Sequence, residues 1–444
     1  MTGSPLTAAA LLLAAVATVA IGAYGVRFSR TTSDFLVASR TVGSQWNAAA
    51  ISGEYLSAAS FLGVAGLIAK YGADALWYPV GFTAGYLGLL LFVAEALRRS
   101  GAYTVPDFAE FRLGSARLRK VAMLVVVVVC IFYLVPQYQG AGLALKTLLG
   151  TPVWLGPVAV GAIVITNVVA GGMRSITFVQ AFQYWLKLTA IAIPALALTA
   201  LFFSDSGGAE GWKLGGALPP TVQQDTTVSI DTDVVVSVTE PEGVTVSGTL
   251  DGRAVDASDI GAPGDHTLGA GSTLTLAAGA ATPVVAGAPS TGADWIASGR
   301  GFGGHHPLYQ VISIMVATFL GTMGLPHVVV RFYTNPDGRA ARRTTLLVLV
   351  LIGFFYMIPP VYGALGRVYA PELAAAGSDS LVLELPGLML GGLGGQVLTG
   401  MVVGGAFAAF LSTSSGLAIA VAGVLSQDVF PRPFRGRRLS GVTG

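Results

Sequence analysis

Apolar runs long enough to cross a lipid bilayer recur along the whole chain. A membrane-spanning helix needs about 20 apolar residues to cross roughly 30 Å of hydrocarbon. Hydropathy predicts nine such spans, which are Leu6–Val26, Trp46–Ile68, Ala75–Leu97, Val121–Leu145, Val153–Ala170, Ile176–Phe203, Leu308–Val330, Thr345–Leu365 and Gln396–Leu425. The pattern predicts an all-α integral membrane protein whose partner is the lipid bilayer.

Composition agrees with this prediction and excludes several other classes. Of the 444 residues 53% are hydrophobic and 11% are charged, against about 25% charged in ordinary globular domains. Cys130 is the only cysteine, which excludes an intramolecular disulfide and a cysteine-based metal site. The sequence has no phosphate loop, nucleophile elbow or metal-ligand cluster, so we expect no enzyme, no cofactor and no nucleic-acid partner.

The distribution of Lys and Arg predicts the orientation in the membrane. If the N-terminus is extracellular, the inner loops hold 18 of the 25 basic residues, as expected for cytoplasmic loops. In this count Arg331 belongs to the inner loop after the seventh span. We therefore expect a multi-pass cell-membrane protein with an extracellular N-terminus and a cytoplasmic C-terminus.

Residues 204–306 differ from the rest of the chain. They hold twelve of the 23 acidic residues and three Lys or Arg. The stretch TTVSIDTDVVVSVTEPEGVTVSGTL alternates polar with β-branched residues, a pattern typical of strands, and Gly, Ala, Ser and Thr follow it. We expect a small, acidic, β-rich extracellular insertion with flexible flanks, acting as a solubilising surface or as a weak cation-attracting vestibule.

The second span contains the polar stretch SGEYLSAASFLG. Gly53 and its neighbouring serines weaken the helix, and non-helical backbone is tolerated at membrane depth only where it lines a cavity or is buried in protein. Glu54 either faces a polar cavity, as ionisable groups in membranes usually do, or reaches the inner surface or a neighbouring helix. We favour an interrupted helix at a binding site.

Two later spans carry features that could complete such a site. Ser412 and Thr413 share a helix face with small residues, where they either coordinate a ligand or serve helix packing. In GTMGLPHVVVRFY, Pro326 and two glycines predict a second kink or break. The adjacent His327 could bind substrate, relay a proton or be a structural imidazole.

Together, several motifs resemble those of the sodium:solute symporter family, in particular its cation/acetate symporter and monocarboxylate transporter branch. The motifs are SGEYLSAASFLG, SGAYTVPDFAEFRLG, GGMRSITFVQ, GLPHVVVRFYTNPDGRAARRTT and FAAFLSTSSGLAIAVAGVLSQDVF. The resemblance implies an inverted-repeat fold of five plus five helices, preceded by one extra helix. It also implies an ion and a substrate held midway across the membrane between two broken helices.

The resemblance further implies the residues of the site. The Na⁺ ligands would be the carbonyls of Ala48, Ile51 and Ala409 and the hydroxyls of Ser412 and Thr413. Candidates for substrate binding or coupling are Glu54, Tyr55, Ser57, Gln137, Gly324 and His327. Na⁺ would be the coupling ion, with H⁺ as the alternative. Gln180 stands where sugar-transporting relatives tend to have Asp, which argues against a sugar as substrate.

Relatives continue for several helices beyond SQDVF, so the second repeat is expected to be truncated. The expected parts are 1–203 (N-terminal helix and first repeat), 204–306 (insertion), 307–430 (three helices of the second repeat) and 431–444 (a basic cytoplasmic tail). The hypothesis is a symporter that couples Na⁺ entry to uptake of acetate, propionate or pyruvate. The alternatives are a carrier of another small solute such as an amino acid, or a nonfunctional fragment.

Overall fold

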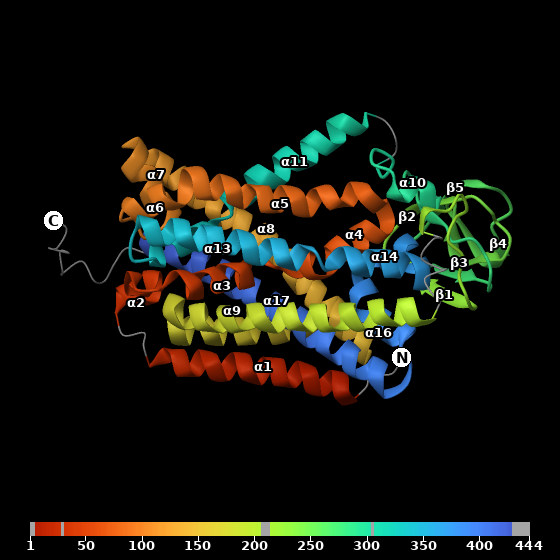
Figure 1. The fold of residues 1–444 in the computed structure, drawn as a ribbon, viewed down its shortest axis with the longest axis horizontal. Helices are drawn as coiled ribbons and strands as arrows, with labels where there is room; N and C mark the ends of the chain where they lie inside the picture. The colour runs from red at the N-terminus through yellow and green to blue at the C-terminus, as the bar shows by residue number, and fades with distance from the viewer. Residues whose placement is uncertain (1–4, 28–30, 206–213, 303–305, 429–444) are drawn as a thin grey trace.

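The computed structural model describes residues 5–27, 31–205, 214–302 and 306–428. Long helices lie side by side in a bundle, and a β-domain sits at one end of it (Figure 1). Within the described residues, seven helical segments are long and apolar enough to cross a membrane, and Leu155–Val169 is a shorter apolar helix. The nine predicted spans are mostly helical, and the second, the seventh and the eighth contain a break. The number of spans differs because Ala59–Arg99 joins parts of the second and third predicted spans.

The bundle consists of long helices and of shorter ones that meet at breaks. Its elements are α1 (Pro5–Val26), α2 (Thr32–Val37), α3 (Ser44–Tyr55), α4 (Val64–Tyr71), α5 (Trp77–Gly88), α6 (Ala94–Arg99), α7 (Val105–Leu113), α8 (Ala116–Leu149), α9 (Leu155–Asp205), α11 (Pro307–Gly324), α12 (Pro326–Arg331), α13 (Gly338–Tyr356), α14 (Pro359–Tyr369), α15 (Glu372–Ala375), α16 (Leu381–Met389) and α17 (Gly392–Asp428). Helix α17 is buried along most of its length and packs against α9, α1 and α8.

Both predicted interruptions are present. Helix α3 ends at Tyr55, the backbone leaves the helical region at Leu56 (ψ 84°), and helix resumes at Ala58. Helix α11 ends before Leu325 (ψ 112°), and Pro326 starts α12, as a proline at the first helical position favours. Helix α9 is two helices joined at Gly172, which has a positive φ of 56°.

The insertion forms the predicted β-domain. Its strands are β1 (Thr226–Ser229), β2 (Val234–Val238), β3 (Val244–Leu250), β4 (Arg253–Asp259), β5 (Gly264–Leu268), β6 (Thr273–Leu276) and β7 (Val284–Val285), with the short helix α10 (Gly292–Ile296) after them. The sheet order is β1-β6-β3-β5-β2-β7, with β4 paired to β3. Alternate Val and Leu side chains of these strands fill a separate apolar core.

The expectation of flexible flanks was wrong for the stretch after β4. That stretch contains β5 and β6, and β6 pairs antiparallel with both β1 and β3. Leu274 and Leu276 are fully buried whereas the threonines that alternate with them, Thr273 and Thr275, are not. A short period-two pattern within Gly- and Ala-rich sequence was therefore enough to form a strand. The predicted basic tail, 431–444, lies outside the described residues.

The end of the insertion is fixed to the bundle near the end of α4. The indole N–H of Trp295 donates to the carbonyls of Ile68 (2.9 Å) and Ala69 (3.0 Å). The Asp74 carboxylate accepts hydrogen bonds from Ser298 and from the backbone N–H groups of two glycines that follow it. Figure 1 shows that α1 begins at this same end of the bundle and that α17 ends at the opposite one.

Candidate substrate and ion site

The interrupted span lies close against the second half of α9. A Cβ atom on Gly53 would overlap the carbonyl oxygen of Gln180 and would press on the side chain of Tyr184. Glycine is therefore required for the two backbones to approach this closely. The approach places the break at Leu56 in the buried interior of the bundle.

The hydroxyl groups of α17 meet the end of α3. Ser412 Oγ donates to the Gly53 carbonyl at 2.8 Å, and Thr413 Oγ1 donates to the Glu54 carbonyl at 2.6 Å. Both hydroxyl-bearing residues are fully buried. The structure thus brings together the two elements that the sequence analysis singled out.

The remaining predicted Na⁺ ligands lie beside this contact. Ala48 and Ile51 are buried inside α3, where helix geometry commits carbonyl groups to hydrogen bonds within the helix. The Ala409 carbonyl accepts a hydrogen bond from Ser412 Oγ at 3.1 Å. Their role as ion ligands stays a prediction, since the carbonyls that meet the hydroxyls of α17 belong to Gly53 and Glu54.

A lysine that the sequence analysis did not single out lies between the break and α17. Lys187 Nζ donates to Ser412 Oγ and to the Leu56 carbonyl, both at 2.8 Å, and also to the Gly53 carbonyl. Its side chain is fully buried. A signal was available, because an ionisable residue inside a predicted span is a functional candidate by default, and Lys187 falls within the span Ile176–Phe203.

Glu54 forms a buried ion pair with Arg331. Arg331 Nε lies 2.7 Å from Glu54 Oε2, and both side chains are inaccessible to solvent. The prediction that Arg331 lies in an inner loop was therefore wrong. Arg331 is the last residue of the short helix α12, which turns it into the bundle, and pairing offsets the cost of burying its charge.

Other hydrogen bonds of Arg331 extend this pair into a network. Its guanidinium also donates to Thr177 Oγ1 at 2.8 Å and to Gln180 Oε1. Gln180 in turn donates to the Ser412 carbonyl at 2.8 Å. The network connects α12, α9 and α17 around the carboxylate of the interrupted span.

The cluster holds two basic groups and one acidic group in a buried place. Glu54, Arg331 and Lys187 are each buried, so their formal charges leave one positive charge when all three are ionised. An uncompensated charge is costly in such surroundings. The cluster is therefore suited electrostatically to an anionic solute.

Three further substrate candidates line the break. The Tyr55 hydroxyl lies 3.0 Å from Thr322 Oγ1 of α11. Ser57 Oγ accepts from the Tyr133 hydroxyl at 3.4 Å. Gln137 Oε1 accepts from the backbone N–H of Ala58 at 3.0 Å, so it caps the helix where it resumes.

His327 belongs to the same buried region, whereas Gly324 does not. The imidazole of His327 is fully buried and its ring lies 5.3 Å from the ring of Tyr133. Neither ring nitrogen has a hydrogen-bond partner among the described residues, and the same is true of Glu54 Oε1 and Ser52 Oγ. Buried polar groups normally have partners, so these atoms are available to bind a solute or water. Gly324 is exposed at the end of α11.

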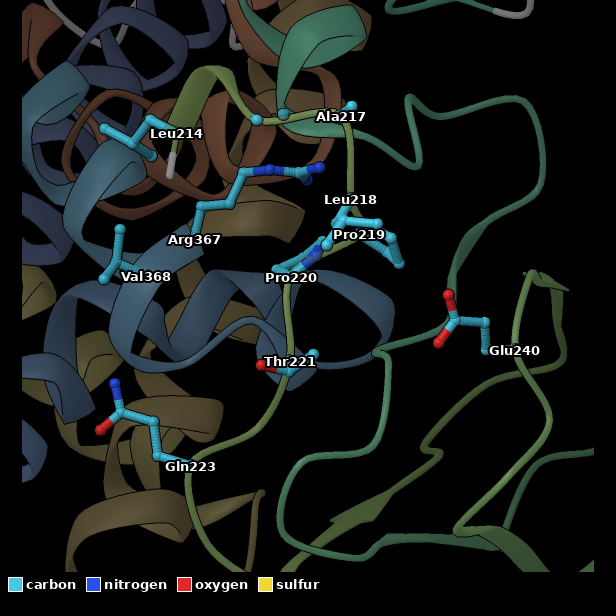
Figure 2. Close-up of a pocket in the computed structure, with 12 residues that line it drawn as sticks. Leu214, Ala217, Leu218, Pro219, Pro220, Thr221, Gln223, Glu240, Arg367 and Val368 are labelled. Atoms are coloured by element: carbon cyan, nitrogen blue, oxygen red, sulfur yellow. The ribbon is translucent and has the colours of Figure 1, made fainter. Parts of the chain in front are cut away.

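A cavity of about 440 Å³ lies elsewhere, between the β-domain and the end of α14. Figure 2 shows Arg367 directed toward the segment that carries Ala217 and Leu218, with Glu240 on the far side. Arg367 donates to three successive carbonyls, 289–291, and lies over the ring of Trp295. It therefore serves to anchor the β-domain, and the cavity shares no lining residue with the Glu54 cluster.

Comparison with known proteins decides the family. The sodium:solute symporter family profile matches residues 35–214 and 268–438. The chain belongs to the sodium:solute symporter family. The unmatched interval, 215–267, covers β1 to β4 and most of β5. As a member of this family the chain is a multi-pass membrane transporter protein and not an enzyme.

Two relatives match nearly the whole chain. It is 30% identical over 431 residues to the uncharacterized symporter YwcA of Bacillus subtilis, covering 97% of this chain and 69% of the relative. It is 30% identical over 420 residues to a monocarboxylic acid transporter of Corynebacterium glutamicum, covering 91% of this chain and 64% of the relative. The chain thus spans about two thirds of the length of these relatives.

A solved structure shares the fold. The substrate-bound, outward-open state of a Na⁺-coupled sialic acid symporter matches with a TM-score of 0.64 at 13% sequence identity. The match covers 96% of this chain and 75% of the other. The likeness establishes the transporter fold of the helical bundle.

Proposed function

We propose that the protein is a secondary active carrier that couples the entry of a cation to the uptake of a short monocarboxylate such as acetate, propionate or pyruvate. The observation that carries the proposal is the buried cluster at the interrupted helix. Glu54, Arg331 and Lys187 there leave one positive charge. The nitrogens of the buried His327 have no partner among the described residues. The relative named as a monocarboxylic acid transporter supports the same class of solute.

In the proposed arrangement the helices form an inverted repeat around this cluster. The β-domain and the start of α1 face the outside of the cell membrane, as the distribution of basic residues predicts. The carbonyls of Ala48, Ile51 and Ala409 and the hydroxyls of Ser412 and Thr413 remain the proposed place of the coupling cation. Na⁺ is the cation expected for the family, and H⁺ is the alternative.

Coupling needs only a modest difference in affinity between the two states of the carrier. Each 1.4 kcal/mol changes the population ratio about tenfold, and coupling free energies of 1–3 kcal/mol are typical. A cation that holds the end of α3 against α17 supplies such a difference, because Ser412 and Thr413 bond directly to that end. The bound anion then compensates the positive charge of the closed cluster.

Uptake of labelled acetate, propionate and pyruvate by cells without endogenous carriers tests the proposal. We expect saturable uptake that unlabelled short monocarboxylates compete for and amino acids do not. Thr413→Ala should weaken uptake, whereas Thr199→Ala should not. Within the described part of the chain the Thr199 hydroxyl bonds only to a carbonyl of its own helix (2.7 Å).

Two results would count against this function. Competition by amino acids but not by monocarboxylates would favour the alternative solute. Absence of saturable uptake by protein that reaches the membrane would refute carrier activity for this chain.

A further inference from the structure

We infer that Lys187 is a tethered cation that takes the place of a free coupling ion between the interrupted helix and α17. On this inference no Na⁺ binds between these two elements, and transport does not require Na⁺. The transport half of the inference rests on the proposed function. The ion-binding half rests on the geometry alone.

The first argument is that the ammonium is fully coordinated. A protonated lysine has three N–H donors and no acceptor. Lys187 Nζ has three acceptors: the carbonyls of Gly53 and Leu56 at the break, and Ser412 Oγ of α17. Each donor thus has a partner, and the partners come from the two elements that a coupling cation would join.

The second argument concerns the oxygens that a sodium ion would need. Ser412, one of the predicted Na⁺ ligands, is already bonded to Lys187. A second cation among the same oxygens would be repelled strongly, because like charges interact with little screening in a buried site. Free Na⁺ can therefore bind there only if the ammonium leaves or loses its proton.

The third argument is the charge of the surroundings. Glu54 of α3 is the charged group that acts electrostatically on Lys187 among the described residues, and Glu54 is paired with Arg331 of α12. Helix α17 contributes hydroxyl groups to the contact and no ionisable side chain. With Lys187 protonated the cluster carries one positive charge, which one monocarboxylate neutralises.

Thermal unfolding of the purified full chain tests the ion-binding half. Melting is compared in NaCl and in choline chloride at equal ionic strength for the wild type, Lys187→Ala and Lys187→Met. We expect no Na⁺-specific shift for the wild type. In the variants the lysine no longer occupies the oxygens of Gly53, Leu56 and Ser412. Their melting temperature should therefore rise on the order of a few degrees in saturating Na⁺ relative to choline.

Lys146→Ala is the matched control. Lys146 is exposed near the end of α8 and pairs with Asp231 of the insertion, so this variant should behave as the wild type. A Na⁺-specific shift in the wild type would overturn the inference even if neither Lys187 variant folds. Folded Lys187 variants that remain insensitive to Na⁺ would overturn it as well.

Proteoliposomes test the transport half, with initial rates of pyruvate uptake corrected for protein-free vesicles. The rate in NaCl should equal the rate in choline chloride for the wild type and for Lys146→Ala. In Lys187→Ala the oxygens are free, so the rate in NaCl should exceed the rate in choline chloride.

The two proposals fail in different ways. Wild-type uptake that requires Na⁺ would overturn the role of Lys187 and leave the carrier function standing. If no monocarboxylate crosses in either salt, the proposed function fails, and the melting comparison in Na⁺ and choline still decides whether Lys187 fills the ion site.

Discussion

The buried pair of Glu54 and Arg331 allows a test of the network at the site. The two side chains are fully buried and 2.7 Å apart. Removing one member of such a pair leaves an unpaired buried charge and typically costs about 3–5 kcal/mol. We expect this cost for Arg331→Met and for Glu54→Gln singly.

The double variant Glu54→Gln, Arg331→Met should lose less free energy of unfolding than the sum of the losses of the two single variants. It removes both charges together, so the remaining cost comes from the lost hydrogen bonds to Thr177 and Gln180, at about 1 kcal/mol each. The interaction energy from the double-mutant cycle should therefore exceed about 2 kcal/mol. Unfolding of the purified protein by heat, and by denaturant where it is reversible, measures these values.

Arg174→Met is the matched control for this cycle. Arg174 also pairs with a carboxylate, Asp34 at 3.1 Å, but its side chain is 33% exposed. Partly exposed pairs contribute at most about 1 kcal/mol, so this variant should lower stability little. Additive effects of the Glu54 and Arg331 substitutions, or single effects no larger than that of Arg174→Met, would refute the reasoning.

Three further predictions concern other contacts. Gly416→Ala should cost about 1–3 kcal/mol of stability, because the added Cβ would overlap the Glu54 carboxylate. Trp295→Phe should cost about 1–2 kcal/mol and raise hydrogen exchange at the end of α4, where its indole bonds two carbonyls. A hydrogen bond to Asp251 raises the pKa of His266 above 6.5. The protonated imidazole should therefore protect the amides of β5 from hydrogen exchange fully below about pH 6.5, and this protection should be lost as the pH rises through the raised pKa. The difference in exchange rate between the wild type and His266→Gln measures it.

Each of these has a control in the same chain. Gly353→Ala adds a methyl group where nothing lies within 4 Å, so it should not destabilise α13. Trp154→Phe changes a tryptophan that is 63% exposed and should leave exchange near α4 unchanged. For His266, exchange differences that grow with increasing pH would show that the sign assigned to the imidazole is wrong.

The sequence predicts the fold well where a local signal exists. Pro326 and the glycine and serines around Glu54 disfavour helix in their own segments, and both breaks occur there. The alternating valines of the insertion likewise form β2 and β3. In each case the deciding chemistry lies within a few residues of the element.

The chemistry of the site is harder to predict because its partners are distant in sequence. Arg331 and Glu54 are 277 positions apart, so hydropathy treats the arginine as the start of a loop. Lys187 is one charge in a long apolar run, and averaging over a window hides it. Its acceptors lie 131 to 225 positions away, and only packing of α9 against both α3 and α17 brings them together.

The two interrupted helices are connected to each other by a buried ion pair and by hydrogen bonds, from Asn47 to the Arg331 carbonyl (3.1 Å) and between Tyr55 and Thr322 (3.0 Å). Glu54 is two residues before the break at Leu56, and Arg331 ends the short helix that starts after the break at Leu325. Lys187 fixes the first break to α17 through separate hydrogen bonds. Lys187 thus joins the first break to α17, whereas the ion pair joins the first break to the second. In the proposed cycle the two broken helices would move as a unit relative to α17, which is the kind of motion that alternating access requires.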